Sequence, residues 1–110
     1  MASTFSDSLT SAGTAFPASP NTIIPFEAER VTLTNTDATN TIMVAFGNGG
    51  AADAAALAQL QANEVAVPPS TTIKLDSFHI GHQTGFGAVA CEVRVRSAAG
   101  TPLVILNADA

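Results

Sequence analysis

The chain has 110 residues, enough for one domain of ordinary size that buries a core without disulfides or a metal ion. Its formal net charge is −5 and it holds only four Lys and Arg residues, which excludes nucleic-acid binding through a basic patch and disfavours an anionic membrane surface. Charged residues make up 12% of the chain, about half of the usual ~25%. A surface so poor in charge is expected where partner proteins cover it.

The N-terminal sequence MASTFSDSLTSAGTAF has neither a basic residue nor an apolar run, so it does not resemble a secretory signal. No window reaches the ~18 consecutive apolar residues of a membrane span. Cys91 is the single cysteine, which excludes an internal disulfide, and it is expected to be a small buried hydrophobic residue. We therefore expect a soluble protein made in a cytoplasm.

Residues 1–20 are small and polar, with Phe5, Leu9 and Phe16 spaced along them and no sustained period. Such a segment is either a frayed tail or an extended arm that places its large apolar residues on a neighbouring subunit. We predict the arm over residues 1–20 and a β-sandwich domain over residues 21–110.

The segment 31–46, VTLTNTDATNTIMVAF, predicts two strands of a hairpin. Apolar residues occupy alternate positions on both sides, as strands with one buried face require. The run from Asn35 to Asn40 between them favours a turn, because its short polar side chains bond to their own backbone. Before this segment, residues 22–27 predict a short edge strand, since Pro25 cannot donate to a ladder.

Further along the chain, Gly47–Gly50 predicts a turn and residues 51–62, AADAAALAQLQA, are either one short helix or a loop. Residues 64–67 and 71–76 predict strands. Phe78 and Ile80 continue the apolar pattern in the opposite phase, which indicates a bulge or a strand that changes sheet.

The clearest alternation lies in residues 88–96, where Val89, Cys91, Val93 and Val95 are predicted to face inward. Residues 97–100 predict a turn, and residues 101–107 predict a returning strand that is apolar on both faces. Such a strand is either central in its sheet or meets another subunit, and we predict Val104 and Leu106 as subunit contacts. About seven short strands predict an all-β fold, a single antiparallel β-sandwich of jelly-roll type.

No catalytic, cofactor-binding or metal-binding residue is predicted. His79 and His82 lie three apart, whereas a cupin metal site needs two His separated by a single residue and a third His downstream. Asp76 and Glu92 fall on outward strand positions, where acids are ordinary surface residues. The row Glu92, Arg94 and Arg96 is expected to be a solvated face or to form salt bridges.

The segments VTLTNTDATNTIMVAFG, VAVPPSTTIKLD and VRVRSAAGTPLVIL give the chain a resemblance to minor virion proteins of tailed bacteriophages, most of all to head decoration (cement) proteins. The resemblance implies a non-enzymatic subunit of the virion. It also implies that the protein binds the major capsid protein or other virion proteins as a homo-oligomer, commonly a dimer or trimer. The alternative is a receptor- or glycan-binding module of a phage tail or fibre, for which Phe78, His79, His82 and Phe86 are the candidate residues.

Overall fold

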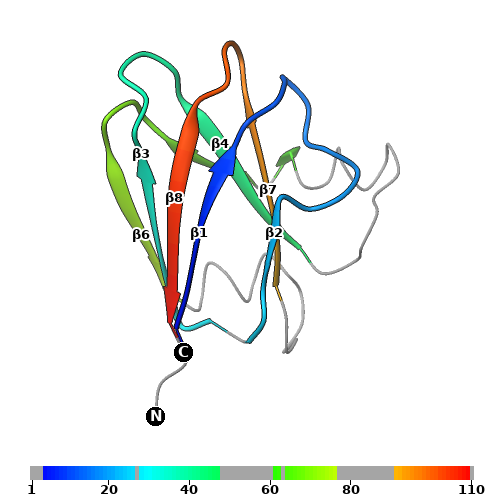
Figure 1. Ribbon diagram of the computed structural model, residues 1–110, viewed down its shortest axis with the longest axis vertical. Coiled ribbons are helices and arrows are strands. Elements are labelled where there is room, and N and C mark those ends of the chain that lie inside the picture. Colours follow the sequence, from blue (N-terminus) through cyan, green and yellow to red (C-terminus); the bar gives the residue numbers. More distant parts are fainter. Residues whose placement is uncertain (1–3, 27, 48–60, 63, 77–90, 110) are drawn as a thin grey trace.

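The computed structural model describes residues 4–26, 28–47, 61–62, 64–76 and 91–109. Within these residues the chain forms eight strands in two four-stranded antiparallel sheets that pack against each other (Figure 1). The strands are β1 Thr4–Thr10, β2 Thr22–Ile24, β3 Arg30–Asn35, β4 Ile42–Gly47, β5 Val65–Val67, β6 Thr72–Asp76, β7 Cys91–Ser97 and β8 Leu103–Asp109. The predicted all-β sandwich is confirmed.

The strand order is β1-β8-β3-β6 in the first sheet and β2-β7-β4-β5 in the second. The first strand therefore pairs with the last, the second with the seventh, the third with the sixth and the fourth with the fifth. A long antiparallel ribbon wrapped around a common core gives this order, which is that of a jelly roll. Its two additional pairings, β3 with β8 and β4 with β7, complete the sheets.

The core lies between the two sheets and follows from the period-two alternation of each strand. Along β3 and β8, every second side chain is buried, and the same holds for the inward positions of β4 and β7. Fully buried large side chains are Leu9, Ile24, Val31, Leu33, Ile42, Val44, Phe46, Val67, Val93, Val95, Val104 and Leu106. Each contributes about 1.5–3 kcal/mol through burial, so the apolar inner faces hold the sheets together. Among the described residues, no helix has the length and apolar character needed to cross a membrane.

Residues 4–20 belong to the sandwich, which corrects the prediction of a separate arm. Thr4–Thr10 forms β1, which pairs along its whole length with β8 of the same chain, with Leu9 opposite Val104. Phe5 and Leu9 face the core in phase, but Asp7 lies between them on the same side and interrupts the apolar alternation. An edge strand tolerates such an inward charge, which also hinders pairing with foreign strands.

The predicted hairpin over residues 31–46 is wrong in its pairing, although both strands exist. β3 lies in the first sheet and β4 in the second, so the turn between them crosses the sandwich. Asn35 fixes this crossing, because its buried amide donates to the carbonyl oxygens of Asn40 at 2.7 Å and Val67 at 2.9 Å. Asp37 closes the turn by accepting hydrogen bonds from the backbone N–H groups of Asn40 at 2.6 Å and Thr39 at 3.0 Å.

The other predicted strands lie close to their observed ranges. The turn after β7 ends on Gly100, whose φ of +70° suits glycine. Several predictions lie outside the described residues. These are the turn after Gly47, the helix or loop over 51–62 except Gln61 and Ala62, the phase change at Phe78 and Ile80, the inward position of Val89, and the side chain of Cys91.

Candidate interaction surface

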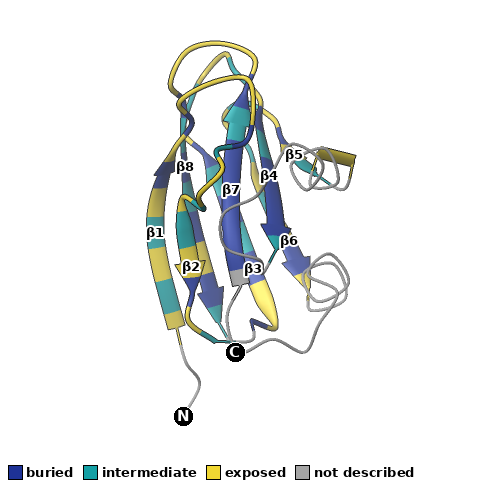
Figure 2. Ribbon diagram, turned by 90° about the vertical axis from the view of Figure 1, so that its right-hand side faces the viewer, coloured by how far each residue is buried: buried dark blue, intermediate teal, exposed yellow. Residues whose placement is uncertain are grey.

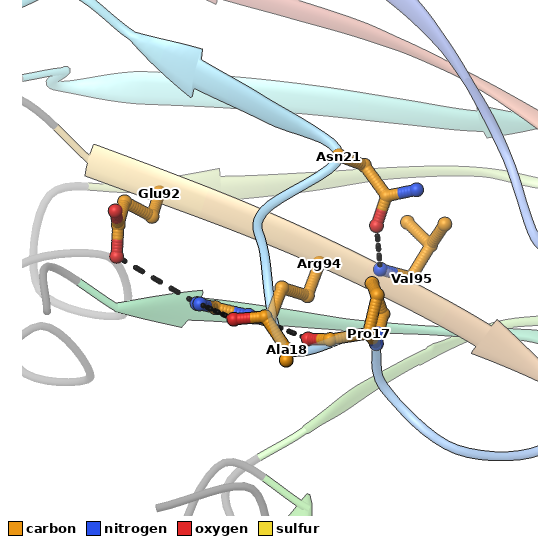
Figure 3. A network of polar contacts seen from close by, with 6 residues as sticks. All are labelled: Pro17, Ala18, Asn21, Glu92, Arg94 and Val95. Atoms are coloured by element: carbon orange, nitrogen blue, oxygen red, sulfur yellow. Dashed lines mark hydrogen bonds and ion pairs between the residues drawn. The ribbon is translucent and has the colours of Figure 1, made fainter. Parts of the chain in front are cut away.

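The outer face of the sheet β2-β7-β4-β5 is crossed at β7 by a segment of the same chain, and we call it the covered face. Residues 11–21, the covering segment, lead from β1 to β2 and pass across β7. Arg94 on β7 donates from Nε to the carbonyl oxygen of Pro17 and from Nη2 to that of Ala18, both at 3.0 Å (Figure 3). The Arg94 side chain is only 2% exposed and lies 3.7 Å from Glu92.

A second arginine of β7 holds the beginning of the covering segment. Arg96 forms a two-bond ion pair with Glu64, with nitrogen–oxygen distances of 2.5 and 2.7 Å. It also donates to the carbonyl oxygen of Thr14 at 3.2 Å, and its guanidinium lies 5.5 Å from the centre of the Phe16 ring. This spacing suits a cation–π contact, so Phe16 is buried against the arginine.

Main-chain contacts complete the attachment of the covering segment. Ser97 N–H donates to the carbonyl oxygen of Gly13, and Val95 N–H donates to the side-chain oxygen of Asn21. The hydroxyls of Ser11 and Ser97 lie 2.9 Å apart in the interior. The row Glu92, Arg94 and Arg96 is therefore not a solvated face, because it binds a segment of its own chain. In Figure 2, β7 is accordingly dark blue along nearly its whole described length.

The outer face of the other sheet, β1-β8-β3-β6, is different, and we call it the open face. Its side chains form cross-strand rows that follow from the strand register. From one end to the other the rows are Ser8, Ile105, Thr34 and Thr72; then Ser6, Asn107, Thr32 and Lys74; then Thr4, Asp109, Arg30 and Asp76. All of these side chains are exposed or half-buried.

Half of the side chains in these rows carry hydroxyl groups. Ser6 donates to the side-chain oxygen of Asn107 at 2.6 Å, and the hydroxyls of Thr34 and Thr72 lie 3.0 Å apart. At the charged end, Arg30 Nε lies 3.1 Å from Asp109 Oδ1 in an ion pair whose side chains are 74% and 39% exposed. At this end, Arg30, Thr32, Lys74, Asp76 and Asp109 line a hollow of about 470 Å³ together with Val31 and Leu75. The mixed hydroxyl and charged rows suit contact with another protein surface.

The five predicted subunit contacts do not lie on a free surface. Leu9, Val104 and Leu106 are core residues, Phe16 belongs to the covering segment and is buried against Arg96, and Phe5 packs half-buried against the core. The prediction for β8 chose the wrong phase, since the outward apolar residues are Leu103 and Ile105. An all-apolar run gives no signal of which side faces out, whereas the Thr residues of the neighbouring strand β3 mark its outer side.

Within the described part of the chain, no three His, Cys, Asp or Glu side chains gather as metal ligands. Phe78, His79, His82 and Phe86, the candidates for a receptor or glycan site, lie outside the described residues. The pKa of the Asp37 carboxyl lies below its ordinary value, because backbone N–H groups of Asn40 and then Thr39 bond to the charged form. This shift belongs to a turn and marks no reactive group.

No protein-family model matches the sequence, and no curated protein matches it. Solved structures resemble its fold. The SPBc2 prophage-derived protein YomS is 11% identical, with a TM-score of 0.51 over 100% of this chain and 96% of that one. PirA is 14% identical with a TM-score of 0.49 over 94% and 92% of the two chains, and a de novo designed double-stranded β-helix is 10% identical with a TM-score of 0.43 over 96% and 99%. The likeness to YomS supports the sandwich fold.

Proposed function

We propose that this protein is a non-enzymatic structural subunit of a tailed-phage virion, a capsid decoration protein that binds the assembled head lattice. The observation that carries the proposal is the contrast between the outer faces. The covering segment packs across β7 on one outer face, whereas the other outer face is left open and carries hydroxyl groups on half of the side chains in its rows. The resemblance of three of its segments to decoration proteins supports the same assignment, and the prophage origin of YomS is compatible with a phage source.

The chemistry of the open face suits a protein contact. Small hydroxyl side chains lose less on removal from water than charged ones do, and they can form hydrogen bonds to a partner backbone. Leu103 and Ile105 provide apolar area at the centre of the sheet. On a capsid, each contact is repeated many times, so a modest affinity per copy is sufficient when copies are linked.

The test is co-sedimentation of the purified protein with heads of the phage that encodes it. We expect saturable binding in a fixed ratio to the major capsid protein. Ile105→Asp, which places a charge in the middle of the open face, should abolish binding. Ala66→Asp adds the same charge at an exposed position on the outer side of β5 and should leave binding intact. Wild-type protein that stays in the supernatant would overturn the proposal. Full binding by Ile105→Asp would show that the open face has no role in binding to heads.

A further inference from the structure

The positive charges of this chain are distributed unevenly. Of its four Lys and Arg residues, Arg94 and Arg96 hold the covering segment and the other two, Arg30 and Lys74, both lie on the open face. Asp76 and Asp109 balance them there, so the open face is neutral while the rest of the chain carries its net charge of −5. Two copies of the chain repel each other through their other surfaces, but not through this face.

The strand register makes the open face complementary to itself. A two-fold axis that runs parallel to the strands, between the central strands β8 and β3, places β8 of one copy over β3 of the other. Each row then meets the same row in reverse order. Arg30 faces Asp109 of the second copy, Asp109 faces its Arg30, and Ile105 faces its Thr34.

We propose that the open face binds a second copy of this chain in an isologous dimer in which Arg30 and Asp109 form reciprocal ion pairs across the two-fold axis. This inference rests on the proposed function, in which linked copies bind the head lattice: the open face provides the link between two copies, and the linked pair binds the lattice through its remaining surface. Arg30 already bonds Asp109 of its own chain through Nε alone, and its guanidinium carries five N–H donors. The four side chains thus form one network at the charged end of the interface.

Geometry favours this axis over the alternatives. A two-fold axis across the strands would place the charged row over the hydroxyl row and leave both ion pairs without partners from the second copy. Sheets that pack face to face align within about 30°, and long arginine side chains span the offset that this angle introduces. The sheet is four strands wide, so the area that it can bury lies near the lower limit for stable interfaces. We therefore expect a dimer that dissociates on dilution.

The experiment is sedimentation velocity over a wide concentration range, with charge-reversed variants. We expect wild-type protein to shift from monomer to dimer as concentration rises. Arg30→Asp and Asp109→Arg should each raise the dimer dissociation constant by about tenfold or more, because each variant places like charges opposite one another at both symmetric positions. An equimolar mixture of the two variants should dimerise again, since Asp at position 30 of one copy then meets Arg at position 109 of the other.

Two controls separate this result from unfolding and from general charge effects. The double variant R30D/D109R restores both ion pairs within one sequence and should dimerise like the wild type. Ala66→Asp, on the outer side of the other sheet, should leave dimerisation unchanged, and thermal melting should show that all variants fold. A wild-type monomer at every concentration, or a mixture no more associated than its components, would overturn the inference. Wild-type protein that binds phage heads as a monomer would remove only this inference, whereas a dimer that ignores heads would remove only the proposed function.

Discussion

The outer faces of the two sheets differ in what their side chains contact: a segment of the same chain on one face and solvent on the other. On the covered face, Arg94 lies almost entirely out of water and binds the carbonyl oxygens of Pro17 and Ala18. On the open face, Arg30 makes its ion pair in solvent. An arginine thus stabilises the monomer on one sheet, whereas an arginine on the other sheet is available to bind a partner. Burial, and not charge alone, decides which role an arginine has.

The largest expected difference between the faces comes from removing these two arginines. Arg94→Leu should lower the free energy of unfolding by about 3–5 kcal/mol, because it leaves Glu92 and two carbonyl oxygens buried without their cation. Arg30→Leu removes a solvent-exposed ion pair and should cost about 0–1 kcal/mol. Urea denaturation of both variants at low protein concentration measures the difference. Equal losses would show that the covering segment is not held by Arg94.

The two sides of β8 provide the next comparison. Leu106→Ala should cost about 2–5 kcal/mol, because Leu106 is fully buried between the sheets and truncation leaves a cavity. Ile105→Ala, one position away on the open face, should cost about 1 kcal/mol or less in the monomer and should weaken dimerisation. Thermal melting and sedimentation velocity give the two quantities. A larger loss of stability from Ile105→Ala than from Leu106→Ala would show that Ile105, and not Leu106, faces the core.

A smaller effect is expected at the turn that joins the two sheets. Asn35→Ala should cost about 1–3 kcal/mol, because it removes the donors to the carbonyl oxygens of Asn40 and Val67 in the interior. Thr34→Ala removes a hydroxyl contact on the open face and should change stability by about 0.5 kcal/mol or less. Chemical denaturation of the pair checks the prediction, and a near-neutral Asn35→Ala would contradict it.

The smallest expected effect is a dependence of the protein's stability on pH in the acid range. Because the folded pKa of Asp37 lies below its ordinary value of 3.8, its charged form adds stability that is present in full above pH 3.8. That stability is lost as the pH falls through the folded pKa. Asp37→Asn lacks this titration, so its melting temperature should lie below that of the wild type at pH 7 and approach it at low pH. A difference that stays constant with pH would assign the effect to something other than the carboxylate.

The sequence predicts much of the fold because most strands alternate cleanly. Val93 and Val95 face inward as predicted, since charged residues separate them, and Gly100 ends the turn that its position indicated. β1 was not predicted as a strand because Asp7 occupies an inward position at the sheet edge and interrupts the apolar alternation. The hairpin was mispaired because a polar turn has the same local composition whether it joins strands of one sheet or crosses to the other.

The candidate surface was less predictable. Which side of β8 faces outward depends on its pairing with β3 and β1, and its apolar run carries no local signal of that pairing. The role of Arg94 depends on a segment 76 residues away in sequence, at Ala18, whose carbonyl oxygen it binds. Contacts of this kind arise only when the sheets are assembled.

Hydroxyl-radical footprinting at low and high protein concentration tests the central claim, that the open face is the contact surface and the covered side is not. Ile23, which is 47% exposed on the outer side of β2, serves as the internal reference. The account predicts that Leu103 and Ile105 lose reactivity at high concentration while Ile23 keeps it. Protection of Ile23 with unchanged reactivity at Leu103 and Ile105 would contradict the account.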